Sequence, residues 1–193
     1  GDEYLGQTHG DILGRDEVQT DLQGELLTCG PGSYYMVPTD NRRQVFHRYF
    51  VDAVRRGARA ACPEEPEFFS RAGYSEAFRR EWQAFYGEPW EDQASSVAAR
   101  YRSDRLKVDL ERRLLQACYE GARSVDAQVE RYLLAHSPLS YTAWSIVFGH
   151  HDMIATGEVD AMIAQVWTGT ARSAVNYQGQ RRERTFENAF LEY

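Results

Sequence analysis

Hydrophobic and polar positions along the chain follow two alternating periods, one typical of helices and one of buried strands. Apolar residues recur every three or four positions in "DNRRQVFHRYFVDAVRRG", which predicts a helix over 39–57. The same spacing predicts a short helix after Ser75 and a long helix over 104–122, whose charged residues we expect on the solvent face. Further helical patterns occur over 140–148 and 185–193.

Four short apolar runs lie between these helices, at 24–30, 58–62, 130–138 and 159–169. Because strand and helix alternate, we expect an α/β fold in which the strands are parallel and buried. Two architectures fit, a stretch of a (β/α)8 TIM barrel and an open doubly wound sheet. No glycine-rich nucleotide motif follows any strand, which removes the usual reason for an open sheet.

We therefore interpret residues 1–193 as a single partial barrel domain, with about four of the eight units present. Half a barrel has exposed strand edges, so we expect either that more chain completes the barrel or that a second copy pairs with it. A helical pattern still runs at Tyr193, which favours a fragment of a longer enzyme.

The amino-acid composition excludes several classes of protein and of binding partner. A hydrophobic content of 42% excludes a disordered chain, and a net charge of −7 argues against binding to nucleic acid. No apolar run is long enough to span a membrane. The three cysteines form no CxxC pair, so no zinc knuckle is indicated, and a reducing, cytoplasmic location is slightly favoured.

The polar residues at the predicted strand ends carry the candidate chemistry, because a barrel places its active site at the carboxyl ends of its strands. Glu64, Glu65 and Glu67 crowd the end of the strand at 58–62. Hydrolysis of a glycosidic bond needs a pair of carboxyl groups, and a neighbouring acid raises the pKa of a proton donor. In the alternative, structural interpretation these carboxylates pair with nearby arginines: Arg59, Arg71 or Arg79.

The segment "EEPEFFSRAGYSEAFRREWQAFYGEPW", followed by "ARYRSDRLKVDLERRLL", resembles the fourth strand-to-helix stretch of TIM-barrel retaining glycoside hydrolases. In that superfamily an Asn-Glu sequence ends the fourth strand, and its Glu is the general acid/base. The resemblance implies that Glu65, followed by Pro66, is the acid/base. Glu64 occupies the Asn position, which departs from the family pattern, and Glu67 is a second candidate.

The same resemblance implies that the strands at 24–30, 130–138 and 159–169 are the third, fifth and sixth of the barrel. It places the nucleophilic Glu at the end of a seventh strand, beyond this sequence. It implies no cofactor and no metal, and an oligosaccharide or glycoside as substrate. The residues expected to contact the sugar by stacking or hydrogen bonds are Tyr34, Tyr35, His136, Gln165 and Trp167.

Two other functions remain open at this point. The protein could be a non-catalytic carbohydrate-binding barrel, or a metal-dependent TIM-barrel enzyme in which the Glu cluster and His136 hold the ion. The "GHHD" sequence at 149–152 is a weak metal motif, because no third or fourth ligand follows at a recognisable spacing. The leading hypothesis is a glycoside hydrolase.

Overall fold

The computed structural model describes residues 15–30, 33–64, 66–136, 145–147, 149, 153–165, 173–177 and 180–184. Its helices are η1 (Arg15–Glu17), α3 (Asp40–Arg55), α4 (Glu76–Tyr86) and α5 (Val97–Arg123). Its strands are β1 (Thr28–Gly30), β2 (Ser33–Tyr34), β3 (Ala60–Ala61), β4 (Phe68–Phe69), β5 (Glu130–His136), β6 (Ile146–Val147), β7 (Ala161–Gln165), β8 (Ser173–Tyr177) and β9 (Gln180–Arg184). Within these ranges, no helix is both long and apolar enough to cross a membrane.

Local capping explains where the three α-helices begin. The hydroxyls of Thr39, Ser75 and Ser96 each accept a hydrogen bond from the backbone N–H three residues further on, at 3.2, 3.3 and 3.0 Å. The helices expected over 39–57 and after Ser75 are thus confirmed as α3 and α4. The long helix is confirmed as α5, and it begins earlier than expected because Ser96 supplies its cap.

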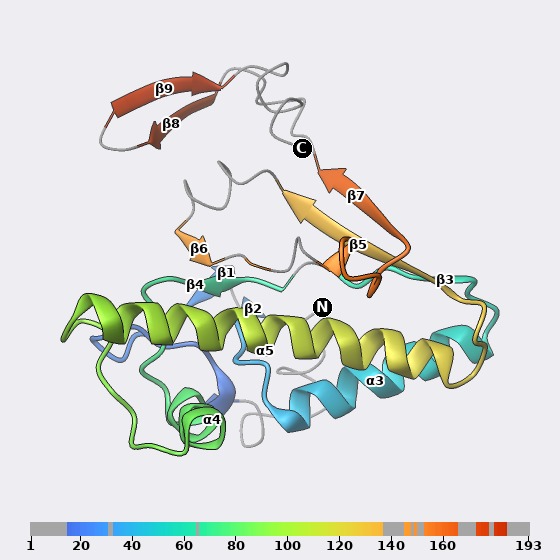
Figure 1. Ribbon diagram of the computed structural model, residues 1–193, viewed down its shortest axis with the longest axis horizontal. Helices are drawn as coiled ribbons and strands as arrows, with labels where there is room; N and C mark the ends of the chain where they lie inside the picture. The colour runs from blue at the N-terminus through green and yellow to red at the C-terminus, as the bar shows by residue number, and fades with distance from the viewer. Residues whose placement is uncertain are drawn as a thin grey trace.

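A parallel three-stranded sheet with the order β3-β5-β7 forms the upper layer in Figure 1. Ala60 lies opposite Glu130, and His136 at the end of β5 lies opposite Gln165 at the end of β7. These strands fall within the predicted runs at 58–62, 130–138 and 159–169. The molecule is therefore mixed α/β with a parallel sheet, as expected.

The expectation of a fourth parallel strand at 24–30 is wrong for the described chain. β1 pairs with β2 and is antiparallel to it. The reason is that the chain reverses at both ends of the apolar run. After the run, Gly30 lies opposite Ser33, so β2 returns alongside β1. Before it, the Asp21 side chain accepts hydrogen bonds from the N–H groups of Gln23 and Glu25, Gly24 adopts a left-handed φ of 81°, and Leu26 returns alongside Thr20.

The helix expected over 140–148 is also wrong where the structure describes it. Ile146 and Val147 form β6, which pairs antiparallel with Phe69 and Phe68 of β4. Two β-branched residues favour a strand, and Ser145 precedes them with a left-handed φ of 57° that ends any helix. Residues 140–144 and the helix expected at 185–193 lie outside the described residues.

A further antiparallel hairpin follows the parallel sheet in sequence. β8 and β9 pair from Ser173 opposite Arg184 to Tyr177 opposite Gln180. The helical and strand patterns of the sequence did not predict this hairpin.

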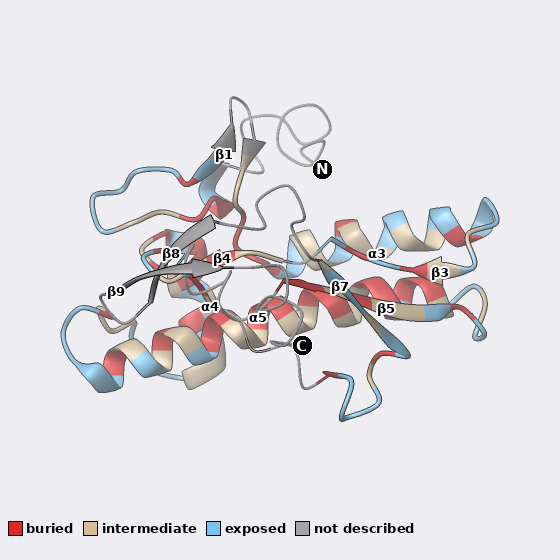
Figure 2. Cartoon of the chain, turned by 90° about the horizontal axis from the view of Figure 1, so that it is seen from above, coloured by how far each residue is buried: buried red, intermediate tan, exposed pale blue. Residues whose placement is uncertain are grey.

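Two hydrophobic clusters hold the layers together, and α5 contributes to both (Figure 2). The first is aromatic and joins α4, β4 and the first half of α5; it includes Phe68, Phe78, Trp82, Leu106 and Leu110. The second is largely aliphatic and joins the second half of α5 to α3 and the sheet; it includes Val54, Ala61, Leu115, Tyr119 and Leu133.

Candidate functional site

β5 and β7 end at the same edge of the sheet, where His136 lies opposite Gln165. β3 stops earlier, since its last residue, Ala61, lies opposite Arg131 near the start of β5. The acidic segment 64–67 follows β3 directly and precedes β4, and in Figure 1 the arrowheads of β5 and β7 point to the same edge. This edge is where the sequence predicts the site.

Burial alternates along the chain that leaves β3. Ala61 and Pro63 are buried, whereas Cys62 and Glu64 are exposed. Since successive side chains of an extended chain point to opposite sides, Glu64 lies on the side away from Ala61, which packs toward α3 and α5. Burial raises the pKa of the Cys62 thiol, and the negative charge of Glu64 raises it further.

His136 is the last residue of β5 and only 5% exposed. By the same alternation, Leu133 and Ala135 face the helices, and His136 faces away from them together with Leu134. Ile163, which lies opposite Leu134 on β7, is 41% exposed. The helix-free face of the sheet is therefore partly open at Ile163, and His136 lies at its carboxyl edge.

The backbone of residues 67–70 is held by three part-buried hydrogen bonds from distant side chains. The Gln19 amide donates to the Glu67 carbonyl at 2.7 Å and accepts from the Phe69 N–H at 3.1 Å. The Glu111 carboxyl group is buried beside Phe68, whose N–H lowers its pKa. The Lys107 ammonium donates to the Ser70 carbonyl at 2.9 Å.

We call this arrangement the polar clamp: the side chains of Gln19, Gln93, Lys107 and Glu111 with the backbone of residues 67–71. Gln93 completes it, because its amide donates to the carbonyls of Ser70 and Arg71 at 3.3 Å each, and its oxygen accepts from Lys107 at 2.8 Å. Ser103 also donates to that oxygen, at 2.7 Å.

The two ionisable side chains of the polar clamp are fully buried, and burial governs their charge. Burial lowers the pKa of Lys107 from 10.5 to about 8, an effect opposed by Asp104 at 3.1 Å. Burial raises the pKa of Glu111 well above its ordinary value; the Phe68 N–H lowers it, the nearby Glu67 raises it and Lys107 lowers it. The interacting pair of acids here is thus Glu67 and Glu111, which lie on different elements.

The arginines considered as partners for the acidic segment contact other groups. Arg59 lies 3.6 Å from Asp126, and Arg79 lies 3.4 Å from Glu76. The Arg71 guanidinium stacks over the Phe69 ring at 4.7 Å. The contacts described for these three arginines thus involve other groups, and the pairing with Glu65, which lies outside the described residues, stays a prediction.

The remaining predicted residues are only partly brought together. Tyr35 packs edge-on against Phe69, with ring centroids 4.7 Å apart, and so reaches the clamped backbone. Tyr34 lies in β2 and packs with Val18, Met36 and Val45, away from the parallel strands. Gln165 occupies the position opposite His136. Glu65 and Trp167 lie outside the described residues.

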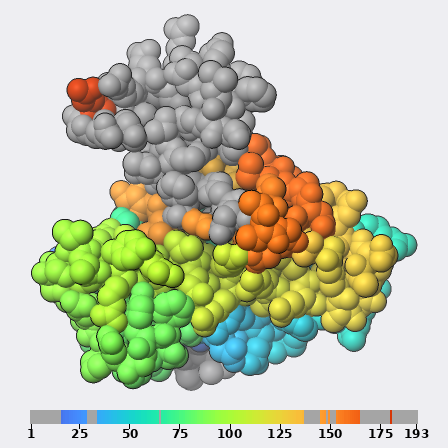
Figure 3. Space-filling model, in the orientation of Figure 1, coloured from blue at the N-terminus to red at the C-terminus, as the bar shows by residue number. Residues whose placement is uncertain are grey.

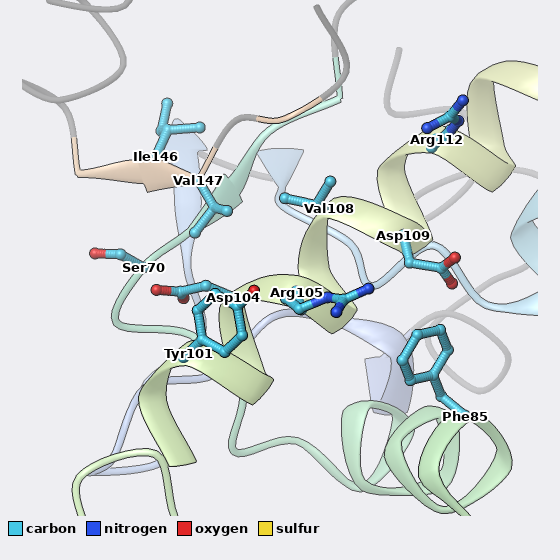
Figure 4. Close-up of a pocket in the computed structure, with 10 residues that line it drawn as sticks. All are labelled: Ser70, Phe85, Tyr101, Asp104, Arg105, Val108, Asp109, Arg112, Ile146 and Val147. Carbon is cyan, nitrogen blue, oxygen red and sulfur yellow. The ribbon is translucent and has the colours of Figure 1, made fainter. Parts of the chain in front are cut away.

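A cavity of about 520 Å³ adjoins the polar clamp on the outer side of α5. Figure 4 shows Ile146 and Val147 on one side and Phe85 on the other, with Asp104 of α5 between them. Asp104 belongs to this wall and accepts a hydrogen bond from Lys107 at 3.1 Å, so the cavity lies directly beside the clamp. Figure 3 shows how far α5, in green to yellow, extends across this face.

The sequence patterns missed the residues of the polar clamp. Lys107 and Glu111 are spaced four apart on a helix, which is the pattern of an exposed ion pair. One available signal of their burial was their position directly after Leu106 and Leu110, which belong to the apolar stripe of α5. Gln19 has no comparable signal, because its partners in the clamp lie about fifty residues away.

No cluster of three or more His, Cys, Asp or Glu side chains within the described ranges could hold a metal ion. Comparison with known proteins found no match to this chain among family models, curated proteins or solved structures.

Proposed function

We propose that this chain forms part of a (β/α)8-barrel glycoside hydrolase, in which the acidic segment after β3 supplies the general acid/base. The observation that carries the proposal is the position of that segment. Glu64 follows the parallel strand β3 on the side away from the helices, and β3 runs in the same direction as β5, which ends in His136. This is the place at which a barrel enzyme builds its active site.

The arrangement of layers supports a barrel over a doubly wound sheet. A doubly wound sheet is covered by helices on both faces, whereas a barrel keeps all of its helices outside. Both α3 and α5 pack on one face of β3-β5-β7, and the sheet order follows the chain order (Figure 1). In a closed barrel, the opposite face, with Leu134 and Ile163, becomes the interior.

In the proposed mechanism Glu65 protonates the leaving oxygen of the glycoside and later removes a proton from the attacking water. A second carboxylate, which the family resemblance places on a later strand, attacks the sugar and forms the covalent intermediate. Glu64 lies beside the acid/base, and its charge would raise the pKa of a neighbouring acid, which suits a proton donor. His136 and Gln165 donate hydrogen bonds to sugar hydroxyls, and Tyr35 and Trp167 contact the ring.

The experiment is a pair of amide substitutions in the complete polypeptide, Glu65→Gln and Glu64→Gln, assayed on a panel of unactivated glycosides. Loss of a general acid costs about 10²- to 10⁴-fold in rate. We expect Glu65→Gln to lose activity on that scale. Glu64→Gln is the matched control, since it removes an equal charge one residue away.

A near-wild-type rate for Glu65→Gln on unactivated glycosides would overturn the proposal. A loss in Glu64→Gln with none in Glu65→Gln would move the acid/base by one residue and contradict the assignment made here. Saccharide binding without turnover in the wild-type protein would instead support a carbohydrate-binding barrel.

A further inference from the structure

Apolar and aromatic side chains from three elements surround the cavity of about 520 Å³ on the outer side of α5. β6 contributes Ile146 and Val147, α4 contributes Phe85, and α5 contributes Tyr101 and Val108 (Figure 4). Tyr101 is 63% exposed here, and Phe85 and Val108 are only half-buried. Apolar side chains that gather around a hollow and remain in contact with water are typical of a ligand-binding site.

The walls of this cavity are held in place by contacts behind them. β6 pairs antiparallel with β4. The Phe85 ring packs edge-on against Tyr86, with ring centroids 4.7 Å apart, and the Arg113 guanidinium lies over it at 5.6 Å. The carbonyl of Ser70, another lining residue, accepts a hydrogen bond from Lys107 at 2.9 Å. Walls that are already ordered lower the entropy cost of binding a ligand.

Four charged side chains of α5 also line the cavity, and three of them are paired with an opposite charge. These pairs are Asp104 with Arg100 and Lys107, Asp109 with Arg113, and Arg112 with Glu158. The fourth, Arg105, is exposed and forms no ion pair with any described residue. In Figure 4 its guanidinium extends toward Phe85. The described lining therefore offers one cationic group without a counter-charge, beside apolar walls.

We propose that this cavity binds a small organic anion, a carboxylate attached to an aromatic or branched apolar body. Arg105 holds the carboxylate, because a guanidinium presents parallel N–H donors that match two carboxylate oxygens. The apolar body lies against Phe85, Val108 and Val147. The volume of about 520 Å³ falls in the range of pockets that enclose small ligands. The site is separate from the acidic segment and does not depend on the glycosidase assignment.

The same charges argue against other classes of ligand. A cationic ligand needs a carboxylate that is free to receive it, and both carboxylates of the described lining, Asp104 and Asp109, already face arginines. A polyanion such as nucleic acid needs several clustered cations, and the chain has a net charge of −7. One unpaired guanidinium suits a ligand with one negative charge.

The test uses cinnamate, an aromatic monocarboxylate, and cinnamamide, its neutral counterpart of the same shape. Calorimetric titration of the complete polypeptide at neutral pH measures both affinities. We expect cinnamate to bind about 10-fold more tightly, because a charge-assisted hydrogen bond is about twice as strong as a neutral one. Acetate, which has the charge without the apolar body, should bind far more weakly than cinnamate.

Three variants separate the charge from the apolar walls. Arg105→Met removes the charge and keeps an apolar chain of similar length, so it should weaken cinnamate by about 10-fold and leave cinnamamide unchanged. Val147→Thr keeps the shape of the side chain but places a hydroxyl in the wall, and it should weaken both ligands alike, by about threefold. Arg48→Met is the matched control, since Arg48 of α3 is also exposed and forms no ion pair with any described residue, but does not line this cavity.

Amide chemical shifts provide the location of binding. Cinnamate should shift the amides of Ser70, Val108 and Val147 in the wild type and in Arg48→Met, and should shift them far less in Arg105→Met at the same concentration. The amide spectra also show whether each variant keeps its fold.

Several outcomes would overturn the proposal. One is equal affinity for cinnamate and cinnamamide in the wild type, and another is an equal loss in Arg105→Met and Arg48→Met. Maltose binding that shifts the same amides and survives Arg105→Met would assign the cavity to a neutral sugar instead. Absence of cinnamate binding up to about 10 mM would also contradict it, since a ligand of this size that fits its pocket should reach about 1 mM or better.

Discussion

The two halves of α5 are built on different principles although they belong to one uninterrupted helix. The half from Val97 to Glu111 packs on aromatic rings and buries Ser103, Lys107 and Glu111. The half after Glu111 packs against α3 and the parallel sheet. Besides Tyr119 and Gly121, it buries only apolar side chains. Its charged contacts, such as Arg112 with Glu158, are only part-buried.

The two halves of α5 show that a buried helix face can serve two purposes. The second half stabilises the layer of helix on sheet by removing apolar area from water, which is non-directional. The first half holds one backbone segment in one place by directional hydrogen bonds, at some cost in stability. The segment so held follows the acidic residues, which is why we connect the first half with function and the second with folding.

The largest expected effect on stability comes from the aromatic half. Trp82 is fully buried, and its indole N–H donates to the Pro89 carbonyl at 3.1 Å. Trp82→Ala should lower the free energy of unfolding by about 4 kcal/mol, because it leaves a large cavity and an unpaired carbonyl. Denaturant unfolding measures the loss. Hydrogen exchange on β5 should change less than exchange on α4; an equal change in both would contradict two separate clusters.

Lys107 should make stability rise with pH in the alkaline range. Its pKa is about 8 in the folded protein and 10.5 when unfolded, so the unfolded chain binds more protons between these values. The burial penalty is fully present below pH 8 and is relieved as pH rises toward 10.5, by about 3 kcal/mol. Asp104 and Glu111 favour the charged form and Arg100 opposes it.

The measurement compares urea unfolding of the wild type and Lys107→Met from pH 7 to 10. The difference between the two curves isolates Lys107 from the tyrosines, which titrate in both proteins. A constant difference across this range would show that Lys107 is not buried as described.

In the second half of α5, close packing of backbones should dominate. A Cβ at Gly121 would lie 2.4 Å from the His47 carbonyl oxygen of α3, which no side-chain rotation can relieve. Gly121→Ala should therefore destabilise the protein by about 2 kcal/mol, although alanine favours a helix. Thermal unfolding tests this. The control is Gly87→Ala, which isolates backbone strain from steric overlap: Gly87 has open space around it, but its left-handed φ of 69° disfavours alanine. A stabilised Gly121→Ala would contradict the close crossing of α3 and α5.

The smallest effect is expected at the surface of the sheet. Arg131 holds the pKa of Asp160 at about 2, below its usual 3.8, by direct hydrogen bonds at the edge of the sheet. This stabilisation is present above about pH 4 and is lost as pH falls through 2. Because the pair is partly exposed, Asp160→Asn should cost less than about 1 kcal/mol at pH 7 and nothing at pH 2. Acid titration of unfolding checks this, and a larger effect at pH 2 than at pH 7 would contradict it.

Local signals predicted the parts of the fold that depend on neighbours in sequence. The capping hydroxyls of Thr39 and Ser75 and the apolar stripes behind them identified α3 and α4, and continuous apolar runs identified β5 and β7. The antiparallel pairing of β1 escaped because the apolar pattern of 24–30 does not show that the chain reverses directly after Gly30. β6 escaped because its partner, β4, lies more than seventy residues earlier in the chain.

The candidate site also has a part that the local sequence indicates and a part that depends on tertiary contacts. The sequence singled out the acidic segment because strand ends in parallel sheets have a general meaning, and its catalytic role stays a prediction. The polar clamp could not be predicted, since whether Lys107 is a surface charge or a buried donor depends on Ser70 and Gln93, which no spacing rule connects to it. Burial is a tertiary property, and buried charges are the least visible in a sequence.

The most direct test of the central claim is the leaving-group dependence of Glu65→Gln. A general acid matters most for poor leaving groups, because good ones depart without a proton. The account predicts a rate loss of about 10²-fold or more on unactivated glycosides and near-wild-type formation of the intermediate from an aryl glycoside with an acidic phenol. Equal losses on both substrates would contradict the acid/base role, and no loss on either would contradict the site itself.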